Sequence, residues 1–233
     1  MLSETSSQPQ LAEHLALPSD QHKADRLPAF LAAVFLVSVP VFVQAPLVRI
    51  QPWLSLLITL VWLLGGVYAL RQETFKLWGD LAIGFSWTWL AGSLYWGWLR
   101  ENPYIHLPVE AIGLPIVLVL ISQQRLKIGS YFYLGSLLGT AITDLYFYWV
   151  DLIPYWQKVM QVEPAAVGGV LQAALIQIEN PIAVIRALGL LSILILVGTI
   201  AIRSQKTHWW AFAGAVLSTI LVDALFLLAA TLA

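Results

Sequence analysis

The chain contains seven long apolar runs, and the basic residues in the gaps between them alternate between pairs and single residues. The pairs are Lys23/Arg26, Arg71/Lys76, Arg125/Lys127 and Arg203/Lys206, and the single residues are Arg49, Arg100 and Lys158. Helical membrane proteins concentrate Lys and Arg in their cytoplasmic loops. The alternation therefore predicts about seven membrane crossings, with the N-terminus cytoplasmic and the C-terminus outside.

Composition agrees with a membrane protein. Hydrophobic residues make up 59% of the chain and charged residues 11%, whereas soluble domains carry about a quarter charged residues. We predict an all-α fold, a polytopic transmembrane helical bundle whose main partner is the lipid bilayer. The net charge of −1 and the absence of a basic stripe argue against nucleic acid as a partner, and the absence of cysteine excludes disulfides and thiolate metal sites.

The boundaries of the spans follow from length, because a helix needs about 20 apolar residues to cross a bilayer. Residues 1–26 are predicted to be a disordered cytoplasmic tail with a short helix at 11–17, and residues 27–233 the transmembrane domain. The predicted spans are 28–48, 52–70, 78–99, 107–122, 129–152, 181–202 and 209–231. Span 107–122 is short enough for a re-entrant hairpin, but a full crossing keeps Arg125 and Lys127 inside. The apolar segment 165–178 fits an interfacial helix or a re-entrant element.

Aromatic residues mark the predicted interfaces, where Trp and Tyr are enriched in membrane proteins. At the outer ends of the spans, four tryptophans are expected to form an aromatic rim: Trp96, Trp98, Trp149 and Trp156. Trp87 and Trp89 fall nearer the middle of a span and are predicted to face neighbouring helices or a cofactor. The spacing of Gly135 and Gly139 (GxxxG) predicts close packing of helices within the chain.

Four ionisable residues fall in the predicted outer half of the bilayer: Glu110, Asp144, Arg186 and Asp223. Each costs about 2.5–3.5 kcal/mol at bilayer depth, so each needs a partner or a function. We expect Arg186 to pair with one of the three acids. Such a pair either orders helix packing or belongs to a substrate-binding pocket open to the outer face; the third alternative is that the side chains only extend to the interface.

Metal and cofactor signals are weak. Asp144 and Asp151 are seven residues apart, and His106 and Glu110 are four apart, but neither pair brings further ligands. We predict no metal and no cofactor, an interfacial hydrogen-bonding role for His106, and water contact for Asp80 at the inner end of its span. No catalytic fingerprint appears, so the chain is not expected to be an enzyme.

Two segments, WTWLAGSLYWGWLRENPYIHLPVEAIGLP from Trp87 and GSYFYLGSLLGTAITDLYFYWVDLIPYWQKVMQVEP from Gly129, resemble an uncharacterised family of cyanobacterial integral membrane proteins, a domain of unknown function. The likeness covers residues 28–232. The family brings no activity or catalytic residue to these positions. The resemblance implies an oxygenic phototroph, and therefore a plasma or thylakoid membrane with periplasm or lumen at the outer face.

Three classes of function stay open. We expect an accessory or assembly protein of a membrane complex, such as a photosynthetic one, whose subunits would be its partners. The alternative is a small-solute transporter or a membrane substrate-binding subunit with a polar site in the outer half of the bilayer. A membrane enzyme acting on lipid or isoprenoid ranks last.

Overall fold

A computed structural model describes residues 24–232, and over this range the chain forms helices and turns without a strand. The predicted all-helical class is therefore confirmed. The predicted disordered tail, as far as residue 23, and the predicted helix at 11–17 lie outside the described residues.

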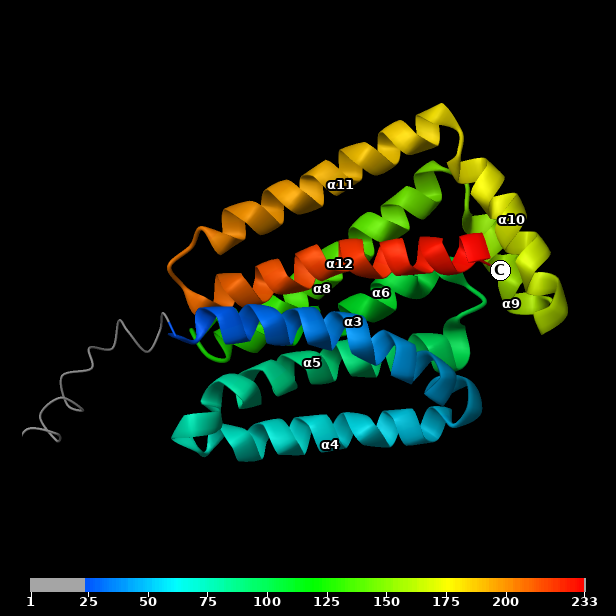
Figure 1. Cartoon of the computed structure of the whole chain (residues 1–233). Helices are drawn as coiled ribbons and strands as arrows, with labels where there is room; N and C mark the ends of the chain where they lie inside the picture. The colour runs from blue at the N-terminus through cyan, green and yellow to red at the C-terminus, as the bar shows by residue number, and fades with distance from the viewer. Residues whose placement is uncertain (1–23, 233) are drawn as a thin grey trace, which may run out of the picture.

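The long helices run back and forth along one common direction (Figure 1). The first half of the chain forms α3 (Arg26–Ile50), α4 (Pro52–Leu70), η1 (Glu73–Phe75), α5 (Lys76–Leu94), the π-helix η2 (Tyr95–Leu99), η3 (Pro103–Ile105), α6 (His106–Glu110), η4 (Ala111–Gly113) and α7 (Leu114–Ser122). The second half forms α8 (Lys127–Trp149), α9 (Ile153–Gln161), η5 (Pro164–Ala166), α10 (Val167–Ile178), α11 (Pro181–Ile202) and α12 (Thr207–Leu232). Each predicted span coincides with one of these helical stretches to within a few residues.

The bundle has two ends of different charge. The start of α3 and the links α4–α5, α7–α8 and α11–α12 lie at one end, which we call the basic end (Figure 1). The α3–α4 link, η2, η3, α9 and α10 lie at the other, which we call the acidic end. In the described chain, seven Lys or Arg and three acids lie nearest the basic end, whereas four Lys or Arg and seven acids lie nearest the acidic end. The alternation in the sequence thus corresponds to two physical ends of the molecule.

Within residues 24–232, five helical stretches are long and apolar enough to cross a membrane: α3, α4, Pro103–Ser122, α11 and α12. The chain therefore has the character of an integral membrane protein. The other two predicted spans form α5 and α8, which are long but carry more Gly, Ser, Trp and Tyr. Eleven residues of α5 are buried, because α5 packs against α3, α4 and α8. Contacts between helices in a membrane are enriched in small and polar residues, whereas surfaces that face lipid are apolar.

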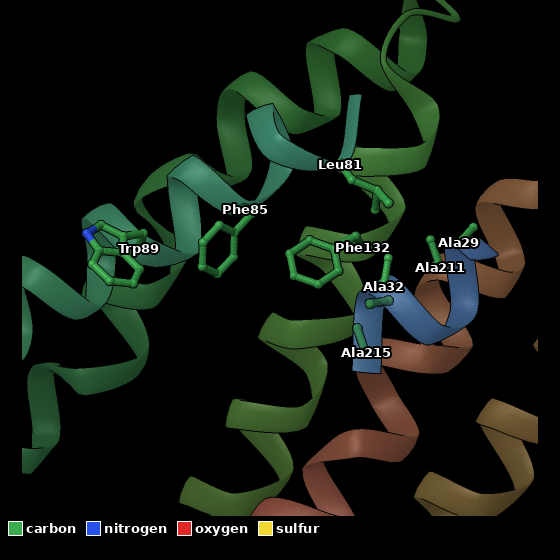
Figure 2. Packing of buried hydrophobic residues seen from close by; sticks show 9 residues of the cluster. Ala29, Ala32, Leu81, Phe85, Trp89, Phe132, Ala211 and Ala215 are labelled. Atoms are coloured by element: carbon green, nitrogen blue, oxygen red, sulfur yellow. The ribbon is translucent and has the colours of Figure 1, made fainter. Parts of the chain in front are cut away.

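Small residues bring the central helices together. On α8, a Cβ at Gly135 would lie 2.6 Å from the Phe212 carbonyl oxygen of α12, and one at Gly139 would overlap the Thr219 side chain. The predicted packing role of the GxxxG motif is confirmed. The aromatic core beside this contact places Phe85 between Trp89 and Phe132, with ring centroids 5.8 and 6.3 Å apart (Figure 2).

The prediction that Asp80 contacts water at the inner end of its span is wrong. Its side chain is buried, and its two carboxylate oxygens accept hydrogen bonds from the backbone N–H groups of Ile128 (3.0 Å) and Gly129 (2.8 Å). These donors have no partner within their own helix, because they belong to its first turn. Asp80 therefore caps α8 and fixes its basic end against α5, where Gly84 and Gly129 meet.

Candidate functional site

Three titratable side chains meet near the acidic end: His106 and Glu110 from α6, and Asp144 from α8. Both carboxylate oxygens of Asp144 lie within hydrogen-bond distance of His106 Nδ1, at 2.9 and 3.0 Å. On the other side of the ring, Nε2 lies 3.8 Å from Glu110 Oε1. All three side chains are at most 14% exposed. We call this group the Asp–His–Glu cluster.

Aromatic rings surround the imidazole of the cluster. The centroid of His106 lies 4.3 Å from that of Tyr95, 5.7 Å from Trp156 and 6.1 Å from Trp96. Trp96 and Trp156 stack on each other with centroids 5.5 Å apart. The two carboxyl groups favour a positive charge at this position, and a ring that turns its face toward the charge would add to the attraction.

Irregular backbone positions these rings. Tyr95 and Trp96 begin the π-helix η2, which extends α5 by a wider turn, and such turns occur frequently at functional sites. Trp156 comes from α9, which folds back after α8 through Asp151, whose φ is +57°. Its indole N–H donates to the Arg100 carbonyl oxygen at 3.1 Å. Thus α9 is held directly over the cluster.

The cluster is closed in this structure. The pocket beside the cluster has no space for a water molecule, and its lining residues are Pro103, His106, Asp144, Phe147, Tyr148, Ile153 and Trp156. The described residues contain no group of three or more His, Cys, Asp or Glu side chains arranged to hold a metal ion. Both ring nitrogens of His106 face carboxyl groups instead. The arrangement can therefore exchange protons or a cation only if α9 or the imidazole moves.

Two of the four predicted ionisable residues lie in the cluster, and two do not. The ion pair predicted for Arg186 is not formed within the described chain, where Arg186 is exposed on α11 and donates to the Trp149 carbonyl oxygen. Asp223 accepts a hydrogen bond from Thr143 on α8 at 3.0 Å. Arg186 does not pair with Asp144 because Asp144 faces α6 from the buried side of α8, where His106 is its hydrogen-bond partner.

The four tryptophans of the predicted rim separate into different environments. Trp96 and Trp156 belong to the wall of the cluster, while Trp98 packs edge-on against Trp53 with centroids 5.2 Å apart. Trp149 is half exposed. The rim is therefore a mixture of site residues and surface residues at the same end of the bundle.

Neither the role of Tyr95 nor the pairing of His106 with Asp144 is predicted from the sequence. The four-residue spacing of His106 and Glu110 indicated that their side chains lie close together, because residues four apart share a helix face. No pattern connects His106 with Asp144, which lies 38 positions further on. Tyr95 stood out only as one aromatic residue in YWGWL.

These features define a class: over the described residues, an all-helical protein with helices long and apolar enough to cross a membrane, and with a buried Asp–His–Glu cluster near one end of the bundle. The chain belongs to the family described as protein of unknown function (DUF3120), whose model matches residues 33–231. No curated protein and no solved structure matches the chain.

Proposed function

We propose that all seven lengthwise helical stretches cross the membrane, with the basic end in the cytoplasm and the acidic end outside. With 19 and 23 residues, α5 and α8 rise about 28 and 35 Å, close to the roughly 30 Å of a hydrocarbon core. The excess of Lys and Arg at the basic end supports the orientation. In this orientation the Asp–His–Glu cluster lies in the outer half of the bilayer.

We propose further that the chain is a small-solute carrier, or the substrate-binding subunit of one, whose substrate is a small organic cation. The observation that carries this proposal is the convergence of two carboxyl groups and three aromatic rings on the imidazole of His106. An alkylammonium ion has the same requirements as an imidazolium, namely negative acceptors and aromatic faces. Ionisable groups inside a membrane commonly mark a substrate or proton pathway.

In this mechanism His106 occupies the binding position while the carrier is empty. Release of the indole of Trp156 from the Arg100 carbonyl oxygen would let α9 swing away and open the cluster to the outer side. The arriving cation would then displace the imidazole from Asp144. The mechanism requires His106 to be an imidazolium in the empty carrier; one positive charge then replaces another, and binding of the cation releases the imidazolium proton to water.

The test measures the melting temperature of the full chain in detergent with choline or spermidine, and with acetate and sucrose as controls. We expect the cations to raise it by several degrees and the controls to leave it unchanged. Asp144→Asn and Trp156→Leu should abolish the cation response, whereas Trp98→Leu, a rim residue outside the cluster, should keep it. No response to cations in the native protein, or an equal response in Asp144→Asn, would contradict the proposal.

A second candidate is the accessory role in a membrane complex, in a cyanobacterial plasma or thylakoid membrane. The closed cluster favours it, because polar groups that satisfy one another can serve helix packing alone. Mild solubilisation of the native membrane followed by affinity purification tests this role. Stoichiometric co-purification of subunits of one complex supports it, and a solitary particle counts against it.

A further inference from the structure

A groove lies between α9 and α10 at the acidic end of the bundle. Its volume is about 270 Å³. The two helices follow α8 and precede α11, beside the ends of the long helices (Figure 1). Both α9 and α10 therefore lie at the level where a membrane-spanning bundle meets the lipid headgroups.

The groove arises from the residues on the facing surfaces of α9 and α10. On the α10 side, Ala166, Gly169 and Ala173 recur at helical spacing and present little or no side chain, and Val170 adds one larger apolar side chain. On the α9 side, the lining residues are Tyr155, Lys158 and Val162. Small residues on α10 opposite larger ones on α9 leave a mostly apolar groove that neither helix fills.

Lys158 gives the groove one positive charge. Its side chain is exposed, and it forms no ion pair with any carboxylate of the described residues. An apolar floor with a single cation at its edge is complementary to an amphiphile with an anionic headgroup. A free anion would use the lysine but not the floor, and a zwitterionic lipid would use the floor but carries a cation of its own beside its phosphate.

We propose that this groove binds an anionic membrane lipid, with the phosphate at Lys158 and the adjoining acyl chain over Gly169 and Ala173. This site is separate from the Asp–His–Glu cluster and does not depend on the proposed transport. The lipid would fix α10 against α9, and α9 carries Trp156 over the cluster. Lipid composition would thereby influence the position of the helix that closes the cluster.

Gly169 permits a clean test, because a Cβ built there meets no atom within 4 Å. Gly169→Leu therefore fills the groove without a backbone clash. Gly189 on α11 is equally open and lines no part of the groove, so Gly189→Leu is the matched control. Lys158→Gln removes the charge and keeps a polar side chain that is one atom shorter.

The experiment titrates the detergent-solubilised full chain with dioleoylphosphatidylglycerol, with dioleoylphosphatidylcholine or with inorganic phosphate, and counts bound lipid by native mass spectrometry. We expect one phosphatidylglycerol bound with about fivefold preference over phosphatidylcholine. Lys158→Gln should lose the preference, Gly169→Leu should lose the bound lipid, and Gly189→Leu should behave as the native chain. Undiminished phosphatidylglycerol binding in Gly169→Leu, equal binding of the two lipids, or competition by millimolar phosphate would overturn the proposal.

Discussion

Asp144 makes the closest contacts of the cluster, because both of its carboxylate oxygens lie within hydrogen-bond distance of His106 Nδ1. Removing one partner of a buried pair leaves the other without compensation and costs about 3–5 kcal/mol. We therefore expect Asp144→Ala to lower the free energy of unfolding by this order. Asp144→Asn keeps an acceptor for the imidazole and should cost about 1 kcal/mol.

Denaturant unfolding in mild detergent, followed by circular dichroism, measures both variants. Glu73→Ala is the control, because Glu73 forms an exposed ion pair with Lys76 and such pairs contribute little. Equal stability of Asp144→Ala and Glu73→Ala would show that the cluster does not support the fold.

At the scale of single residues, the sequence revealed which side chains are costly but not how they pair. Glu110 and Asp144 stood out because carboxyl groups are expensive in an apolar segment. The partner of Asp144 depends on which face of α8 turns toward α6, and that is decided by packing between helices. Arg186 was assigned to an ion pair from depth alone, whereas it lies exposed on α11.

Among the helices, the contact between α5 and α8 depends most directly on glycine. A Cβ at Gly129 would overlap the Asp80 backbone carbonyl, so the two helices would have to separate. Gly65 on α4, by contrast, has no atom within 4 Å of an added Cβ. We expect Gly129→Ala to destabilise the protein by about 1–3 kcal/mol through overpacking. Gly65→Ala should be neutral or stabilising by up to about 1 kcal/mol.

Thermal unfolding of the two alanine variants side by side checks this expectation. The comparison controls for helix propensity, since the same substitution is made in both helices. If the two variants melt at the same temperature, α5 and α8 do not touch as closely as Gly84 and Gly129 indicate.

The helices that face lipid were readable from the sequence, because their apolar character is set by the membrane itself. The short elements at the acidic end were not. The π-helix η2 and the helix α9 depend on contacts such as the one between Trp156 and the Arg100 carbonyl oxygen. The contact between Trp156 and Arg100 joins residues that are 56 positions apart, so no local sequence pattern predicts it.

The topology of the whole molecule is directly testable because the chain contains no cysteine. Single cysteines in place of Gln72, Glu101, Gln123 and Gln161 bracket α5, the Pro103–Ser122 stretch and α8 in turn. With seven crossings, an impermeant maleimide should label the second and fourth in intact cells. The first and third should react only after permeabilisation. Labelling of positions 72 and 101 from the same side would show that α5 does not cross.

The unequal ends of the bundle have an electrical consequence. Seven bases and three acids give the basic end a formal charge of +4, while four bases and seven acids give the acidic end −3. Moving one elementary charge across a membrane potential changes its energy by about 2.3 kcal/mol per 100 mV. In a membrane that is negative inside, a molecule with its basic end inward is a dipole aligned with the field. In the orientation proposed above, the voltage would therefore help to hold the inserted protein with its basic end inward.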